Sequence, residues 1–287
     1  MVERFDPASG VWEPIAPLRG PRAHCAAAAL GGAVYVVGGS NELNSTLRSA
    51  ERYDPRRNVW EAAAAMRRAR AALTAAALGG RLCAVGGLNE QDVHRSVEEF
   101  SPEDGRWSFL PNMVVRRWSA AAAAVGRQLY VVGGRDESDN VIGAVESWDA
   151  DAQMWQPLPP LLTARASAAA AACGGALYIA GGYDEDMGDL RSLERFDPVH
   201  GTWQELAPMP SPRYALGCLA SKGSLYVLGG AVFGGLPGVL LQQAHDGPGP
   251  DRAVLSRVER YDPEAACWLA VGSMPTPRSR AGVAACR

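Results

Sequence analysis

The sequence lacks the features that mark several classes of protein. Gly-Gly pairs interrupt its apolar stretches, so none of them approaches the roughly 20 residues that a membrane-spanning helix needs. The 28 Lys and Arg residues nearly balance the 31 Asp and Glu residues, which leaves no basic surface for nucleic acid. With 47% apolar and 21% charged residues, the chain also differs from collagen and from disordered proteins. We therefore expect a globular chain that binds neither membranes nor nucleic acid.

Cysteine and histidine are both sparse. The 6 cysteines stand singly, without the C-x2-C pairs of a zinc site or the density of a disulfide scaffold, so we expect buried free thiols. The 4 histidines fall in different repeats and predict no metal site. Residues 1–7 lack the basic and then apolar pattern of a secretion signal. We expect a reducing compartment, the cytoplasm or the nucleus, and no cofactor.

The sequence does contain a repeat of about 48 residues. Its tryptophans are Trp12, Trp60, Trp107, Trp155, Trp203 and Trp268. A glutamate precedes each of them by nine positions, at Glu3, Glu51, Glu98, Glu146, Glu194 and Glu259. An arginine follows each by ten positions, at Arg22, Arg70, Arg117, Arg165, Arg213 and Arg278. Double glycines end five apolar runs, at Gly38-Gly39, Gly86-Gly87, Gly133-Gly134, Gly181-Gly182 and Gly229-Gly230.

Each repeat holds four short apolar segments separated by turns, which predicts a four-stranded antiparallel sheet. Strand a is the alanine-rich run after the arginine, strand b ends at the double glycine, strand c carries the glutamate, and strand d carries the tryptophan. Alanine favours helices. Each alanine run is nevertheless only about eight residues long and has no polar face, and the innermost strand of a radial array suits small side chains. We therefore predict strands there.

These units resemble the kelch repeat, whose marks are a double glycine followed by a Tyr and a Trp at this spacing. The resemblance covers essentially the whole chain and implies an all-β fold, a single six-bladed kelch β-propeller over residues 1–287. Departures are local, because an aromatic-Asp-Pro motif recurs in four repeats but becomes Phe100-Ser101-Pro102 and Trp148-Asp149-Ala150 in two others. The last repeat carries an insertion, predicted as a loop over about 231–257.

The closing blade is predicted to be shared by the two ends of the chain. Residues 2–13 supply its strands c and d, and residues 278–286 supply its strand a, as in the closure that kelch propellers use. No segment corresponds to strand b, because the positions equivalent to 32–48 are absent. That gap would leave strand edges unpaired, which natural proteins avoid. We therefore expect the chain to be the carboxyl-terminal part of a longer protein.

Recognition is predicted on the face formed by the b–c and d–a loops, because the b–c loops are long and vary between repeats. Kelch domains that capture peptide degrons use Arg, Ser and Tyr side chains at similar positions to hold acidic or polar peptides. The alternative is ordinary loop filling. The candidate protein-binding residues are His24, Ser40, Trp118, Ser119, Arg135, Ser167, Tyr183, Tyr214 and Arg280.

The residues that recur in every repeat are interpreted as structural. We expect the repeated tryptophans to pack between blades. The repeated arginines should either pair with the repeated glutamates or cap loop carbonyl groups. The double glycines should allow a special backbone geometry or close packing at the end of strand b.

The resemblance implies a protein-interaction module. The repeats are similar to those of kelch-like substrate adaptors, in which upstream BTB and BACK regions bind cullin-3 and the propeller selects the protein to be ubiquitinated. Neither region lies in this chain. The alternative is a standalone kelch protein or one that binds actin. The propeller itself is expected to be monomeric.

An enzyme is not expected. The copper radical oxidases of this fold need paired His and Tyr ligands with a Tyr-Cys crosslink, which the dispersed histidines do not provide. The iron motif of plant specifier proteins fits Glu185 and Asp189 but then meets Leu193 in place of His. Sialic-acid mutarotases of this fold are exported proteins. We therefore predict no catalytic residue and no metal ligand.

Overall fold

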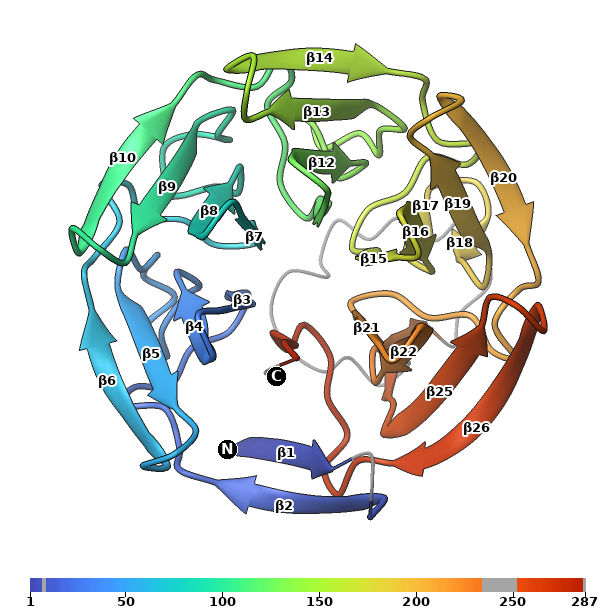
Figure 1. Cartoon of the computed structure of the whole chain (residues 1–287), viewed down its shortest axis with the longest axis horizontal. Helices are drawn as coiled ribbons and strands as arrows, with labels where there is room; N and C mark the ends of the chain where they lie inside the picture. The colour runs from blue at the N-terminus through green and yellow to red at the C-terminus, as the bar shows by residue number, and fades with distance from the viewer. Residues whose placement is uncertain (7–8, 234–251, 286–287) are drawn as a thin grey trace.

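The strands form a ring of sheets around a central channel (Figure 1). The computed structural model describes residues 1–6, 9–233 and 252–285. Within these residues, five sheets have four antiparallel strands each and three further sheets have two. Strand a of each four-stranded sheet lies next to the channel and strand d lies at the perimeter. No helix in these ranges is long and apolar enough to cross a membrane.

The five four-stranded sheets are called blades 1 to 5, with their strands given in the order a, b, c, d. Blade 1 comprises β3 (Ala26–Leu30), β4 (Ala33–Val37), β5 (Ala50–Asp54) and β6 (Val59–Ala63). Blade 2 comprises β7 (Thr74–Leu78), β8 (Arg81–Val85), β9 (Val97–Ser101) and β10 (Arg106–Leu110). Blade 3 comprises β11 (Ala121–Val125), β12 (Gln128–Val132), β13 (Val145–Asp149) and β14 (Met154–Leu158).

Blades 4 and 5 each carry an extra two-stranded ribbon in the b–c loop. Blade 4 comprises β15 (Ala169–Cys173), β16 (Ala176–Ala180), β19 (Leu193–Asp197) and β20 (Thr202–Leu206). Its ribbon is β17 (Tyr183–Asp184) with β18 (Gly188–Asp189). Blade 5 comprises β21 (Gly217–Ser221), β22 (Ser224–Leu228), β25 (Arg257–Asp262) and β26 (Cys267–Ser273). Its ribbon, β23 (Ala231–Phe233) with β24 (Arg252–Val254), bounds the predicted insertion, whose residues 234–251 lie outside the described residues.

The prediction of six blades, of which the closing one lacks strand b, is met only in part, because five sheets have four strands. The predicted strands c and d near the start of the chain form the two-stranded sheet of β1 (Val2–Asp6) and β2 (Val11–Ile15), which completes the perimeter between blades 5 and 1 (Figure 1). The strand predicted over 278–286 is wrong for residues 278–285, which contain no strand, and residue 286 lies outside the described residues. In the other blades strand b lies between strands a and c, so without it this segment has no neighbour with which to form a ladder.

The core lies between blades rather than within one sheet. In blades 1 to 4, the third and fifth residues of strand b pack on the second and fourth residues of strand b in the next blade, as Cys83 and Val85 do on Leu129 and Val131. The alanines of strands a allow neighbouring strands to approach one another around the channel, where β3, β7, β11, β15 and β21 contact one another in sequence. The need for small side chains around the channel therefore outweighs the weak strand propensity of alanine.

The repeated arginines join each blade to the blade before it. The Arg70 side chain donates from Nη1 to the carbonyl oxygens of Gly86 and Ser96, both at 2.8 Å, and pairs with Glu98 at 3.0 Å, all within blade 2. Its own carbonyl oxygen accepts a 2.8 Å bond from the Gly39 amide of blade 1. One residue thus binds two blades at once, by its side chain and by its backbone. Equivalent ion pairs recur as Arg22–Glu51, Arg117–Glu146, Arg165–Glu194, Arg213–Glu259 and Arg278–Glu3.

The junction between blades requires a glycine at both positions of the double glycine. The first glycine faces the carbonyl oxygen of the next repeated arginine, and a Cβ atom added at Gly86 would lie only 2.5 Å from the oxygen of Arg117. The second glycine donates its amide to that same oxygen, as Gly87 does at 2.9 Å. Both glycines have positive φ, +59° and +83° here. The motif therefore provides close backbone contact rather than a ligand site.

The repeated tryptophans close the outer end of the same junction. Each contacts the aromatic residue opposite it on strand c, with ring centroids 5.1 Å apart for Tyr53 and Trp60. In blades 1 to 5 the indole Nε1 also donates to a carbonyl oxygen just after strand d of the preceding sheet, as Trp60 does to Ala16 at 2.9 Å. Each tryptophan therefore packs within its own blade and hydrogen-bonds to the previous one.

Removing one partner of a buried junction pair should strongly destabilise the fold. Arg70 and Glu98 are both 0% exposed, so Glu98→Ala leaves a buried guanidinium unpaired and should lower the free energy of unfolding by about 3–5 kcal/mol. The control is Glu61→Ala, because Glu61 pairs with Arg57 at the surface and is 42% exposed, which should cost about 1 kcal/mol or less. Urea unfolding measures both. Equal losses would contradict the assignment.

A methyl group at the junction glycine should also cost stability. Gly86→Ala places a Cβ atom against the Arg117 carbonyl, whereas Gly79→Ala has a similar φ of +56° but no atom within 4 Å. Both variants share the backbone strain, so the difference between them reports the steric contact. We expect Gly86→Ala to be the less stable by about 1–3 kcal/mol in thermal or urea unfolding. Indistinguishable variants would contradict the close approach.

Candidate functional site

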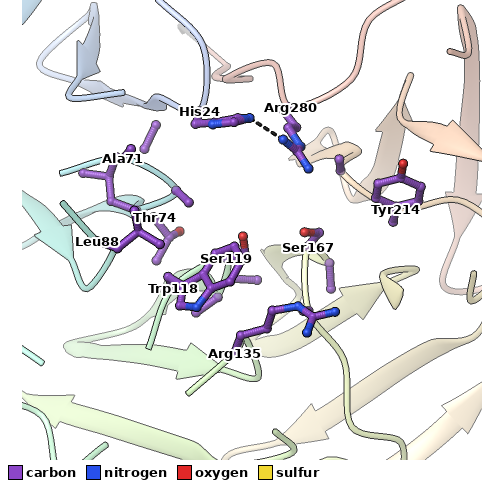
Figure 2. A pocket seen from close by; sticks show the side chains of 18 of the residues that line it. His24, Ala71, Thr74, Leu88, Trp118, Ser119, Arg135, Ser167, Tyr214 and Arg280 are labelled. Carbon is purple, nitrogen blue, oxygen red and sulfur yellow. Dashed lines mark hydrogen bonds between the residues drawn. The ribbon is translucent and has the colours of Figure 1, made fainter. Parts of the chain in front are cut away.

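The channel opens into a cavity of about 1080 Å³ at the end where the b–c and d–a loops emerge. All nine residues predicted from the sequence line this central cavity, although they come from four blades, 1, 3, 4 and 5, and from the segment after β26. Figure 2 shows His24 and Arg280 on one side of the cavity and Arg135 on the other, with Trp118, Ser119, Ser167 and Tyr214 around it. The structure therefore brings the candidate set together. Whether these residues bind a protein stays a prediction.

Two loops of each blade are held together where they enter the cavity. The residue after the repeated arginine forms an antiparallel bridge with the residue after the double glycine. In blade 3 the Trp118 amide donates to the Arg135 oxygen at 3.0 Å, and the Arg135 amide donates back at 2.8 Å. The same bridge forms between Ala166 and Tyr183 in blade 4. These bridges fix variable side chains on a regular backbone.

A ring of backbone hydrogen bonds surrounds the channel below these bridges. Its members are the second residues after the repeated arginines: His24, Ala72, Ser119, Ser167, Ala215 and Arg280. Each of them has φ between 49° and 54°, a left-handed conformation that is uncommon outside glycine. From Ala72 onward each amide donates to the carbonyl oxygen of the previous member at 2.8–2.9 Å. These bonds use only the backbone, which leaves the side chains at the six positions free to vary.

The Arg280 and His24 side chains meet where the two ends of this ring come together. Arg280 belongs to the segment after β26, and its guanidinium contacts the His24 imidazole of blade 1 (Figure 2). Packing supports the same closure, because a Cβ atom added at Gly282 would lie 2.7 Å from Cβ of Ala27. The carboxyl-terminal segment thus joins blade 5 to blade 1 without forming a strand.

Arg135, a candidate residue for holding acidic or polar peptides, makes cation–π contacts and ion pairs within its own chain. Its guanidinium lies over the rings of Trp118 and Tyr183, 5.9 and 5.8 Å from their centroids. It also pairs with Asp139 at 3.2 Å and with Glu185 at 3.4 Å, and its side chain is only 13% exposed. These contacts neutralise and orient Arg135. It therefore organises the blade 3 and blade 4 side of the cavity.

Tyr183 and Tyr214 form the wall over blades 4 and 5. Tyr214 packs with Ala215 and Ala231, and Tyr183 and Phe233 lie against that cluster. Burial raises the pKa of the Tyr183 phenol, which keeps it a neutral hydrogen-bonding group. The amide of Phe233 bonds to Asp189 Oδ2 at 2.5 Å, so the ribbon of the insertion is docked on the blade 4 loop. The insertion therefore begins beside the cavity.

The carboxylates of the cavity were not among the predicted residues. Asp136, Glu137 and Asp139 of the blade 3 loop and Glu185 of the blade 4 loop all line it, against two guanidinium groups. The acidic composition of the b–c loops could have indicated these carboxylates, but acidic loops are more often simply exposed to solvent. Across the described ranges, no three His, Cys, Asp or Glu side chains are grouped to hold a metal. The site offers aromatic faces, hydroxyl groups and separated charges, which suit recognition of a polypeptide.

Removing the Arg135 side chain should loosen its loop without unfolding the protein. Arg135→Ala removes two cation–π contacts and two ion pairs of a partly exposed group, so we expect a loss of about 1 kcal/mol and faster amide exchange over residues 136–141. Arg127→Ala removes the exposed pair with Asp151 and serves as the control. Hydrogen exchange read by mass spectrometry gives the comparison. Unchanged exchange in 136–141 would show that Arg135 does not organise the loop.

Comparison with known proteins agrees with the fold. The solved structure of YjhT is similar to this chain with a TM-score of 0.77 and 18% identity, covering 94% of this chain and 89% of that chain. A search of the curated proteins found no match. The family model described as the Kelch motif matches residues 21–67, 69–114, 116–162 and 164–210, which contain blades 1 to 4 and make up more than half of the chain. With these motif matches and the ring of antiparallel blades, the chain belongs to the kelch-repeat family.

Proposed function

We propose that this protein is an interaction module that binds a polypeptide segment in the central cavity. The supporting observation is that different residues stabilise the fold and line the cavity. Those that recur in every repeat are engaged in junctions between blades, whereas the nine residues that differ between repeats line one cavity. Aromatic and Arg side chains dominate binding energy at protein interfaces, and Trp118, Tyr183, Tyr214 and Arg280 are of this kind.

The charges of the cavity indicate the chemistry of the partner. The blade 3 and blade 4 side carries four carboxylates, and Arg135 compensates part of their charge. Arg280 and His24 occupy the opposite side (Figure 2). A strongly acidic segment would meet the carboxylates unfavourably. We therefore favour a segment that places a basic residue against blades 3 and 4 and an acidic or polar residue near Arg280.

Within this function, we propose a substrate-recognition role in a cullin-3 ubiquitin ligase, in the cytoplasm or the nucleus. The support is the likeness of the repeats to those of kelch-like adaptors, and it requires a BTB domain outside residues 1–287. The alternative is a standalone kelch protein or one that binds actin. A kelch-type enzyme is not favoured, because the dispersed histidines do not supply the ligand sets of the kelch-type enzymes and the cavity wall presents aromatic rings and ion-paired carboxylates.

A partner held in the cavity should depend on its aromatic wall. We expect a double variant, Trp118→Ala with Tyr183→Ala, to weaken the capture of specific partners by about 30-fold or more in affinity capture with quantitative mass spectrometry, since the loss of one anchor alone costs about 2 kcal/mol. Phe109→Ala is the matched aromatic control, because Phe109 is exposed on β10 at the perimeter. Circular dichroism checks that each variant is folded. Recovery that depends on Phe109 but not on the cavity would contradict the proposal.

Two further measurements separate the proposed roles. Co-purification of cullin-3 with the protein from cells supports the adaptor role. Co-sedimentation with actin filaments in the absence of cullin-3 supports the alternative. Loss of actin binding in the cavity double variant would place the filament at the same cavity.

A further inference from the structure

Apolar residues surround one strand position of the ring, between blades 5 and 1, but no strand among the described residues fills it. In blades 1 to 5, strand c pairs with strand d on one edge and with strand b on the other. β1 matches a strand c, because Phe5 pairs with Trp12 as Tyr53 pairs with Trp60, and Glu3 pairs with Arg278 at 2.9 Å. Within the described ranges, β1 has only β2 as a strand neighbour.

The wall of this position on the blade 1 side is exposed where its counterparts are covered. The second residue of strand b packs against the preceding blade, and four of the five such residues are 0% exposed, namely Leu82, Leu129, Leu177 and Leu225. The fifth, Val34 of blade 1, is half-buried. Val34 is the one that faces the position between blades 5 and 1. Its exposure therefore marks a missing neighbour rather than a polar surface.

The wall on the blade 5 side shows the same loss of cover. The third and fifth residues of strand b face the following blade, and Tyr226 and Leu228 of blade 5 therefore face the same position. Both are half-buried, whereas their counterparts in blades 1 to 4 are buried. The counterparts are Tyr35, Cys83, Tyr130 and Tyr178 for Tyr226, and Val37, Val85, Val132 and Ala180 for Leu228.

The floor of the position is equally incomplete. Val2 and Phe5 of β1 are half-buried, although the equivalent residues in all five blades are buried. At the channel end, Val283 of the carboxyl-terminal segment packs directly against Gly217 of blade 5, in the space that a Cβ atom on Gly217 would need. The carboxyl-terminal segment therefore bounds this strand position on the side of the channel. Three apolar walls and the open edge of β1 thus define one slot, called the strand slot: Val2, Phe5, Val34, Tyr226 and Leu228.

We propose that the strand slot binds one extended polypeptide strand from outside residues 1–287, antiparallel to β1. The five complete blades specify its chemistry, because each fills this position with five mostly apolar residues followed by Gly-Gly, such as Ala33–Gly39. Its second and fourth residues would be aliphatic to contact Tyr226 and Leu228, and its third would be Tyr or Cys to contact Val34. Main-chain bonds to β1 supply affinity, and alternate side chains supply specificity.

The test uses a labelled peptide with the sequence of residues 33–39 and terminal lysines for solubility. We expect saturable binding to the 287-residue protein by fluorescence anisotropy and slower amide exchange in β1, with no change in β9. The matched control peptide carries Lys in place of the residues that correspond to Tyr35 and Val37, and it should bind at least tenfold more weakly. On the protein, Val34→Arg should weaken binding at least tenfold. Tyr226→Arg provides the same test on the opposite wall should Val34→Arg not fold.

Three results would overturn the proposal. The first is no binding at about 1 mM peptide together with unchanged exchange in β1. The second is equal binding of the two peptides, which would show non-specific association. The third is slower amide exchange in β1 without peptide, at a rate that depends on protein concentration, together with a doubled mass by light scattering. The strand slot would then be filled by a second copy of this chain.

Discussion

The architecture depends on the contact between one arginine carbonyl and the double glycine of the preceding blade. That oxygen approaches the first glycine too closely for any side chain and accepts the amide of the second, while the same arginine ties strands b and c of its own blade through Gly and Ser carbonyls and a buried glutamate. Burying a guanidinium lowers its pKa and costs solvation, as at Arg70. At Arg70 five hydrogen bonds from the guanidinium offset that cost. The pairing of arginine with glutamate recurs in every repeat.

This junction separates stability from recognition. The backbone ring and the loop bridges position the cavity without using the side chains at those sites, so His24, Ala72 and Ser119 can differ while the hub stays the same. The result is a regular hydrogen-bonded backbone that carries variable loops, an arrangement suited to recognition. The walls of the strand slot likewise keep the apolar pattern of the other blades, although no strand among the described residues covers them.

Periodicity predicted the blades and the grouping of the candidate residues, because spacing alone fixes which positions share one end of a meandering sheet. It could not predict the left-handed conformation of Ala72 or Ser119, since these residues carry no conformational signature of their own. It also could not show that Arg135 is held by Asp139 and Glu185, because this depends on how two loops approach in space. The strand predicted over 278–286 was wrong for residues 278–285. A segment forms a strand in a sheet only if a neighbouring strand pairs with it, and the sequence of the segment itself does not show whether that neighbour is present.

The central claim is that partners bind at the cavity face and not elsewhere on the ring. Photo-crosslinking in cells tests it directly, with a benzophenone amino acid placed either at Ser138, an exposed residue of the cavity lining, or at Lys222, in the a–b turn of blade 5 on the opposite face. The account predicts a discrete crosslinked partner from position 138 and none from position 222. Crosslinks from position 222 alone would place recognition on the other face and contradict it.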